Sequence, residues 1–270
     1  MEITVNGNNS TMPKITKLDR FKELITKAVP GVEDFEFYPK KGDAFNKSLK
    51  SFSADLGKIW NDSGATDYSW YKHKDYLIEC IWTYVVSSGG ATNNMKKYFE
   101  DAGINLNKMS CIDVYNGIGL TTLDLRNMGF DYVMYYNDVD YQVLATSLLL
   151  RSQEKYMRTG WIKDKSILES GGMRFHVVVC LETIEHYKEP IPFTRMLMDL
   201  SYEYLVETTS FCSPQHYGHF EKYLIDGKEV SGMTASRRVH DLIRTEFEQV
   251  FSGFNGRPRI WKRKTNASIG

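Results

Sequence analysis

Two carboxylates and two imidazoles form the most chemically active group that the sequence places near one point. Glu182, Glu185 and His186 follow the apolar run 175–181, and His219 comes after the next apolar run. Converging carboxylates and imidazoles can act as a general base, and they are also ligands that divalent metals accept. The spacing predicts a general base among these residues, while a divalent metal is permitted but not favoured. In the plainer alternative Glu182 lines a pocket, and the other three cap a helix or lie on the surface.

A glycine turn between a predicted strand and a predicted helix is the second feature with chemical meaning. Gly117 and Gly119 follow the apolar run 111–114 and precede a helical pattern that starts at Leu120. Glycine lets the backbone pass close to a ligand, and the N–H groups at a helix start face polar or anionic groups. Thr122 stands where a dinucleotide fingerprint requires glycine or alanine, which disfavours an NAD-dependent oxidoreductase. A tight turn without a ligand is the structural alternative.

An acidic residue follows this turn at the distance that nucleoside binding requires. In dinucleotide-binding folds an acid about twenty residues further on, at the end of the next strand, takes the ribose hydroxyls. Asp138 stands at that place after the apolar run 132–136, and Asp140 is the second candidate. The pattern therefore predicts a ligand that contains a ribose.

Together these segments resemble the motifs of class I S-adenosylmethionine-dependent methyltransferases. The stretch 113–119, Asp-x-Tyr-x-Gly-x-Gly, is similar to their first motif, although Tyr115 replaces the first of three alternating glycines. The stretch 137–140, Asn-Asp-Val-Asp, is similar to their second motif. The run 177–190, which contains Glu-Thr-Ile-Glu-His, resembles their fourth. The resemblance covers residues 91–264 and leaves the N-terminal third outside it.

The resemblance implies transfer of a methyl group from S-adenosylmethionine to an oxygen or nitrogen of an acceptor. It also implies which residues serve the cofactor and the reaction. The implied cofactor-binding residues are Asp113, Tyr115, Asn116, Gly117, Gly119, Thr121, Asp138, Val139, Leu181 and Glu182. The implied catalytic residues are Glu182, Glu185, His186 and His219. The E-x-x-E-H arrangement with a later histidine is also similar to the metal site of small-RNA 3′-end 2′-O-methyltransferases, so a metal stays open.

Two alternatives stand beside an active methyltransferase of this kind. The departure at Tyr115 permits a catalytically silent methyltransferase fold that binds a cofactor or a partner. The stretch 113–119 also resembles the opening motif of DNA cytosine-5 methyltransferases, and Cys180 lies on the strand that carries their nucleophile. Their Pro-Cys-Gln sequence is absent, however, and a cysteine inside the apolar run 177–181 is expected to be inert core.

Hydrophobic periodicity predicts the elements that position these residues. Up to residue 105 apolar residues recur at helical spacing, and Thr92 or Asn93 is expected to cap the last helix. Beyond it, strand-like and helical runs alternate, which is typical of an α/β fold with a doubly wound, mostly parallel sheet. Two short C-terminal segments about Gly256 predict an antiparallel hairpin strand at the sheet edge. We predict a helical N-terminal cap, residues 1–105, and an S-adenosylmethionine-binding Rossmann-like methyltransferase domain, residues 106–270.

Composition limits the partners and the compartment. Lys and Arg number 34, as do Asp and Glu, so no net charge draws the chain to nucleic acid or an acidic membrane. A small-molecule and a nucleic-acid acceptor are not distinguished, although a basic group around Trp261 predicts either phosphate contact or protection of an edge strand. The four cysteines show no C-x-x-C spacing, and we expect neither a signal peptide nor a membrane span in this sequence. We expect a cytoplasmic protein without membrane contact, and predict no particular oligomeric state.

Overall fold

The structure is a computed structural model, which describes residues 88–139, 142, 146, 159–211, 219–253 and 256–265. The helices predicted before residue 87 lie outside the described residues, as does Asp140. The division of the chain at residue 105 therefore stays a prediction.

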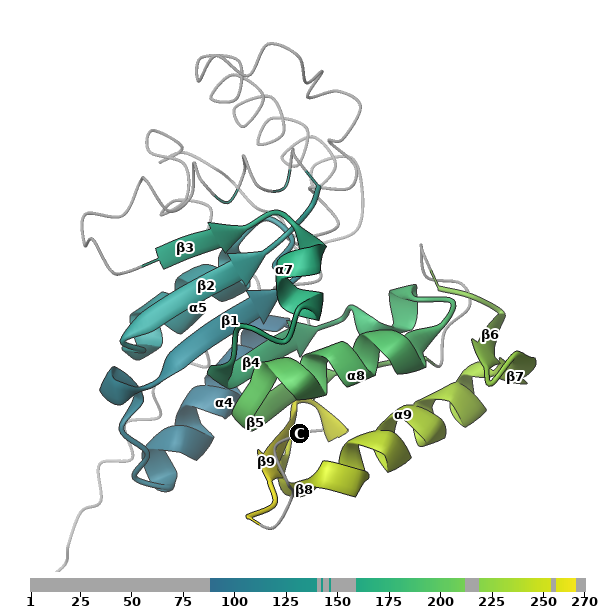
Figure 1. Ribbon diagram of the computed structural model, residues 1–270. Helices are drawn as coiled ribbons and strands as arrows, with labels where there is room; N and C mark the ends of the chain where they lie inside the picture. The colour runs from purple at the N-terminus through teal and green to yellow at the C-terminus, as the bar shows by residue number, and fades with distance from the viewer. Residues whose placement is uncertain are drawn as a thin grey trace, which may run out of the picture.

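Within the described residues, seven strands form one mixed sheet in the order β3-β2-β1-β4-β5-β9-β8 (Figure 1). They are β1 (Ser110–Val114), β2 (Tyr132–Tyr136), β3 (Thr159–Ile162), β4 (Phe175–Leu181), β5 (Ser201–Thr208), β8 (Phe247–Ser252) and β9 (Arg259–Arg263). The first five pair in parallel, and β9 pairs antiparallel with both β5 and β8. The predicted α/β fold, with its mostly parallel sheet and C-terminal antiparallel hairpin, is confirmed. The basic strand β9 is interior, however, and β8 is the edge.

Helices cover both faces of the sheet because the central strands are apolar on both sides. Their bounds are α4 (Gly89–Asp101), α5 (Leu120–Met128), α7 (Lys165–Glu169), α8 (Pro190–Leu200) and α9 (Gly232–Glu246), with the 3-10 turns η3 (Leu106–Lys108) and η4 (Ile184–His186). A small separate hairpin, β6 (Lys222–Ile225) and β7 (Lys228–Ser231), precedes α9. One buried core lies between the sheet and α8 and α9, and a second lies between the sheet and α4 and α5. Such burial on both faces is typical of parallel sheets.

The start of α4 differs from the sequence prediction. Ser88 already has right-handed helical angles and the helix begins at Gly89, so neither Thr92 nor Asn93 is its cap. The Thr92 hydroxyl instead donates to the Gly89 carbonyl and to Asp124 of α5. Met95 and Phe99 of the same helix are buried against the sheet. The last helix of the predicted cap thus packs on the sheet.

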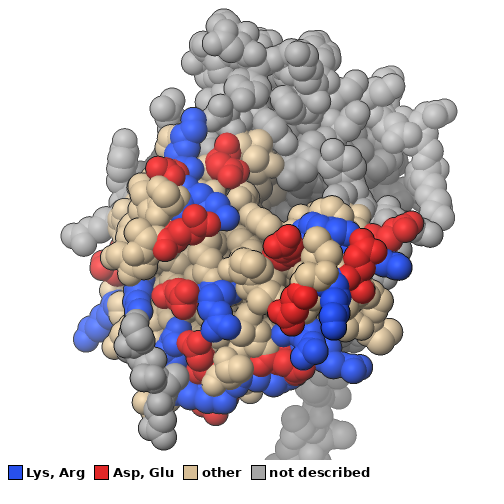
Figure 2. All heavy atoms as spheres, turned by 45° about the vertical axis from the view of Figure 1, so that its right-hand side comes forward, with Lys and Arg blue, Asp and Glu red and all other residues tan. Residues whose placement is uncertain are grey.

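Surface charge on the face formed by α8, α9 and the small hairpin is mixed. Figure 2 shows Lys and Arg interspersed with Asp and Glu over this face. At physiological ionic strength, interactions between exposed charges more than about 8 Å apart are largely screened. In the part of the chain that the structure describes, no helix combines the length and the apolarity that crossing a bilayer requires.

Candidate active site

The carboxyl ends of four adjacent parallel strands bring the predicted site residues to one edge of the sheet. Asp113 is near the end of β1, Asp138 follows β2, Glu182 follows β4 and Glu207 lies near the end of β5. Ligands of open α/β sheets bind at this edge, near the point where the strand order reverses. Here the order reverses between β1 and β4, beside the glycine turn.

The turn from β1 into α5 requires unusual backbone angles. Tyr115, Gly117 and Gly119 have φ values of 56°, 54° and 89°, in the left-handed region that favours glycine. A Cβ at position 119 would lie 2.7 Å from a side-chain carbon of Thr146, so glycine is also needed there for space. Tyr115 adopts the left-handed angle without being a glycine.

Asp113 is buried beneath this turn and fixes it. The Thr122 hydroxyl donates to its Oδ2 at 2.7 Å, and Asn116 donates to the Thr122 hydroxyl at 2.9 Å. Burial raises the pKa of Asp113 to about 7, the Thr122 bond opposes this rise, and the charge of Asp124 adds to it. The threonine that breaks the dinucleotide fingerprint is therefore the donor that holds the first acid of the motif.

Asn137, which the sequence analysis did not select, joins the first two motifs. The Nδ2 of its fully buried side-chain amide has three acceptors within hydrogen-bond distance: Asn116 Oδ1 at 3.0 Å, the Gly117 carbonyl at 3.2 Å and Gln142 Oε1 at 2.6 Å. Its Oδ1 accepts the N–H of Val139 at 3.0 Å. The sequence offers one signal for this role: Asn137 is a polar amide that directly follows an apolar strand and precedes Asp138.

Asp138 is exposed at the end of β2, where the sequence places it. Its Oδ2 accepts the hydroxyl of Tyr136 at 3.0 Å and that of Tyr115 at 3.2 Å. Among the other predicted cofactor contacts, Thr121 is in the first turn of α5 and Val139 is half-buried after Asp138. These positions surround the same strand ends.

Glu182 directly follows Leu181, the last residue of β4, with a left-handed φ of 51°. Its N–H donates to the Thr208 hydroxyl at 2.9 Å, which ties it to the end of β5. Its carboxylate lies 3.5 Å from Arg257 Nη1, and its side chain is 17% exposed. Glu182 is thus a partly accessible carboxylate at the strand end.

Glu185 is fully buried. The plainer sequence interpretation expected it to cap the next helix, but α8 has no side-chain cap. Its Oε1 accepts the Ser210 N–H at 3.1 Å, while its Oε2 has no hydrogen-bond partner among the described residues. Burial, followed by the charge of Glu182, raises the pKa of Glu185 to about 8. Near neutral pH this carboxyl therefore keeps its proton.

His186 and His219 meet, as their positions after adjacent strands suggested. Their ring centroids are 4.8 Å apart at an interplanar angle of 70°. His186 is exposed and His219 is half-buried. Within the described ranges, no three His, Cys, Asp or Glu side chains form a group that could hold a metal ion.

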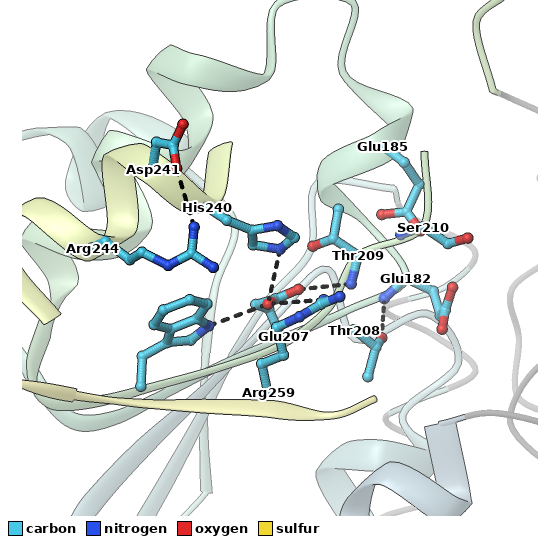
Figure 3. A network of polar contacts seen from close by, with 11 residues as sticks. Glu182, Glu185, Glu207, Thr208, Thr209, Ser210, His240, Asp241, Arg244 and Arg259 are labelled. Atoms are coloured by element: carbon cyan, nitrogen blue, oxygen red, sulfur yellow. Dashed lines mark hydrogen bonds and ion pairs between the residues drawn. The ribbon is translucent and has the colours of Figure 1, made fainter. Parts of the chain in front are cut away.

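Glu207, which is completely buried, is the centre of a charged network behind the acid pair (Figure 3). Its Oε1 lies 3.2 Å from Trp261 Nε1, 3.3 Å from Arg259 Nη1 and 3.4 Å from His240 Nε2. Its Oε2 accepts the Thr209 N–H at 2.7 Å. Burial alone would raise the pKa of Glu207, but His240 and Arg259 lower it to about 2.

This network fixes the segment 208–210, which contacts both site acids. Figure 3 shows Glu182 and Glu185 on one side of the segment and the Glu207 network on the other. Thr208 accepts from Glu182, and Ser210 donates to Glu185. The sequence analysis missed this role because the partners of Glu207 come from α9 and β9.

Cys180 fits the prediction of an inert core residue. It is 1% exposed, and burial raises its pKa well above the ordinary value. A nucleophilic cysteine needs the opposite change. The cytosine-5 alternative therefore has no activated thiol at this position.

Comparison with solved structures identifies the fold. The chain is similar to magnesium protoporphyrin IX methyltransferase (ChlM) from Synechocystis PCC 6803 with bound S-adenosylmethionine, at a TM-score of 0.52, 16% identity and coverage of 78% of this chain and 97% of that one. The same enzyme with bound S-adenosylhomocysteine gives a TM-score of 0.50, 14% identity and coverage of 78% and 99%. No protein-family model and no curated protein sequence matches the chain. The chain has the fold of class I S-adenosylmethionine-dependent methyltransferases.

Proposed function

We propose that the chain binds S-adenosylmethionine and transfers its methyl group to an oxygen or nitrogen of an acceptor. One observation carries the proposal: the glycine turn, the exposed Asp138 and the acid pair Glu182 and Glu185 come together at one edge of a methyltransferase-type sheet. The fold by itself would leave the function open, because one fold supports many functions. The residues at this edge supply the specific argument.

The residues present fit the cofactor. Asp138 already accepts two hydroxyl groups, which is the chemistry that a ribose diol requires. The turn 115–119 is fixed from below by Asp113, so its backbone can approach a ligand without losing its shape. In this proposal Asp138 and Val139 hold the nucleoside, while Gly117, Gly119 and Leu181 face the rest of the cofactor.

When bound, the cofactor supplies an electrophilic methyl group on a sulfonium centre. Glu182 is the accessible carboxylate of the pair, and it can accept the proton that the acceptor O–H or N–H loses. Glu185, whose pKa is raised by burial and by the charge of Glu182, keeps its own proton near neutral pH and is not assigned this role. His186 is an alternative proton acceptor at the same edge, since it is exposed and contacts His219.

Cofactor binding is tested by calorimetric titration with S-adenosylhomocysteine. We expect Asp138→Ala to weaken binding by about ten- to a hundredfold, equivalent to about 1.4 to 2.8 kcal/mol. Asp226→Ala, in the exposed turn of the small hairpin, is the matched control and should bind like the unmodified chain. No binding by the unmodified chain would reject the proposed function. Unchanged affinity in Asp138→Ala would reject only the role of Asp138.

Activity is tested by release of S-adenosylhomocysteine from S-adenosylmethionine in the presence of acceptor mixtures that contain hydroxyls, amines or RNA. Glu182→Gln should strongly reduce release, because Gln cannot accept the proton, and titration of the variant with S-adenosylhomocysteine separates this loss from weaker cofactor binding. Full turnover in excess chelator would exclude a metal. Tyr115 in place of a glycine permits the silent-fold alternative, which predicts binding without release for every acceptor.

A further inference from the structure

In the turn 115–119, the one non-glycine residue with a left-handed φ is held in place by an aromatic cluster. Tyr115 has a left-handed φ of 56°, a backbone conformation that is strained for a non-glycine residue. Its ring lies 4.9 Å from that of Tyr136 at 78°, and 6.0 Å from the rings of both Tyr187 and Phe193. Its N–H donates to the Tyr136 carbonyl at 2.9 Å. The packing fixes Tyr115 at the position where its hydroxyl meets Asp138.

The two tyrosine hydroxyls converge on one oxygen of Asp138. Tyr136 donates to Oδ2 at 3.0 Å and Tyr115 at 3.2 Å, and the two hydroxyl oxygens are 3.5 Å apart. Burial raises the pKa of Tyr136 well above its ordinary value, and its contacts with Tyr115 and Asp138 add to the rise, so its hydroxyl stays a donor at neutral pH. Two donors on Oδ2 hold the carboxylate in one rotamer.

We propose that Tyr115 and Tyr136 are positioning residues that orient Asp138, so that its other oxygen, Oδ1, is directed to the ribose of the nucleoside ligand. The proposal rests on the proposed function and adds a specificity device to it. An exposed carboxylate otherwise loses rotamer freedom when it binds a ligand, and a preorganised group avoids that cost. Tyr115 stands where the family motif has a glycine, and its side chain orients Asp138 at the end of the neighbouring strand β2.

The device predicts discrimination by the ribose. We expect the unmodified chain to bind S-adenosylhomocysteine about tenfold more tightly than its 2′-deoxyribose analogue, because an oriented carboxylate loses a partner when a hydroxyl is missing. Tyr136→Phe and Tyr115→Phe keep the rings and remove the hydroxyls. Each should weaken S-adenosylhomocysteine binding by about three- to tenfold and reduce the preference over the deoxy analogue.

Tyr132→Phe is the matched control, since it removes a tyrosine hydroxyl from the other end of the same strand β2. It should leave both affinities unchanged. In the Asp138→Ala background, Tyr136→Phe should cause no further loss, because a residue that acts through Asp138 has nothing left to orient. A general packing defect would instead cause a further loss in the Asp138→Ala background, and it would weaken the binding of S-adenosylhomocysteine and of its deoxy analogue equally.

The outcomes separate this inference from the function on which it rests. If the unmodified chain fails to bind S-adenosylhomocysteine, both are overturned. If it binds and both phenylalanine variants bind equally well, only the positioning role is overturned. Tighter binding by the variants also overturns it, because the hydroxyls would then compete with the ribose. Thermal unfolding of each variant checks that it is folded, and Tyr115→Phe, whose side chain is only partly buried, keeps the test valid if Tyr136→Phe does not fold.

Discussion

At the carboxyl ends of β1 and β2 neutral amides and hydroxyls hold the backbone, whereas at the ends of β4 and β5 charged groups do so. The first region uses Asn116, Thr122 and Asn137 around one buried acid, Asp113. The second uses His240 and Arg259 around another buried acid, Glu207. Both acids are almost fully buried, so burial by itself raises the pKa of each.

The partners decide the outcome. Asp113 meets a hydroxyl, which does not offset the cost of burying a charge, and its pKa rises to about 7. Glu207 meets His240, the guanidinium of Arg259 and two N–H donors, and its pKa falls to about 2. At neutral pH one acid is therefore near its titration point and the other is fully ionised. The comparison shows that the partners of two buried strand-end acids in one sheet can set their pKa values, and therefore their charges at neutral pH, in opposite directions.

The largest effect that this difference predicts is the loss of the buried charge at β5. Glu207→Ala leaves the buried His240 and the half-buried Arg259 without their acid, and breaking a buried pair costs about 3 to 5 kcal/mol. Chemical denaturation at pH 7 measures the free energy of unfolding. A loss below about 1 kcal/mol would mean that the network contributes no more than a surface pair, and that the comparison fails.

The pH dependence of stability separates the two acids. The folded-state pKa of Asp113 is raised, from 3.8 to about 7, so its ionisation makes the folded state less stable as the pH rises through this range. The difference corresponds to about 4 kcal/mol. Asp113→Asn keeps an acceptor for Thr122 and cannot ionise. Its stability relative to the unmodified chain should increase from pH 4 to pH 7 and stay constant above.

For Glu207 the dependence of stability on pH has the opposite sign and falls in a lower pH range. Its folded-state pKa is depressed, so its contribution is complete above about pH 4.5 and is lost as the pH falls toward 2. Unfolding of Asp113→Asn and of the unmodified chain should therefore be compared between pH 4 and 8, where Glu207 contributes little change. Parallel curves for the two proteins would show that Asp113 does not titrate with the raised pKa.

Most of the first region could be predicted from the sequence, because its partners are close in the chain. The glycines mark the turn, the apolar run marks β1, and Asn116 is only six residues from Thr122. Asp138 was placed from the spacing of strand ends. The bonds of Asn137 were not predicted, since a buried amide at a strand end has many alternative partners.

The second region could not be predicted, because it depends on strand order. Glu207 is 52 residues from Arg259 and 54 from Trp261, and they meet only because β9 inserts between β5 and β8. The sequence predicted the hairpin but placed its basic residues on an edge strand. Periodicity marks a strand, but it does not reveal which neighbour the strand pairs with. Arg259 can contact Glu207 only because β9 pairs with β5.

A smaller effect tests the neutral network. Thr122→Val keeps the shape of the side chain but removes the donor to Asp113 and the acceptor for Asn116, which should cost about 1 to 3 kcal/mol. Thr194→Val is the control: Thr194 is equally buried, and its hydroxyl donates only to a carbonyl of its own helix α8. We expect a clearly smaller loss there by denaturation. Equal losses would mean that the hydroxyl matters only for packing.

The smallest effect belongs to a pair with the same chemistry as the Glu207 network but without its burial. Glu229 lies 3.5 Å from Lys188 Nζ, with the two side chains 56% and 38% exposed. Water screens such a pair, and Lys188 also donates to the Lys222 carbonyl at 2.6 Å, so it keeps a partner when Glu229 is removed. Glu229→Ala should therefore change the free energy of unfolding by less than about 0.5 kcal/mol, and added salt should reduce even that. Denaturation of Glu229→Ala beside Glu207→Ala makes the comparison within one residue type. If the two variants lost similar stability, burial would not be what distinguishes the end of β5.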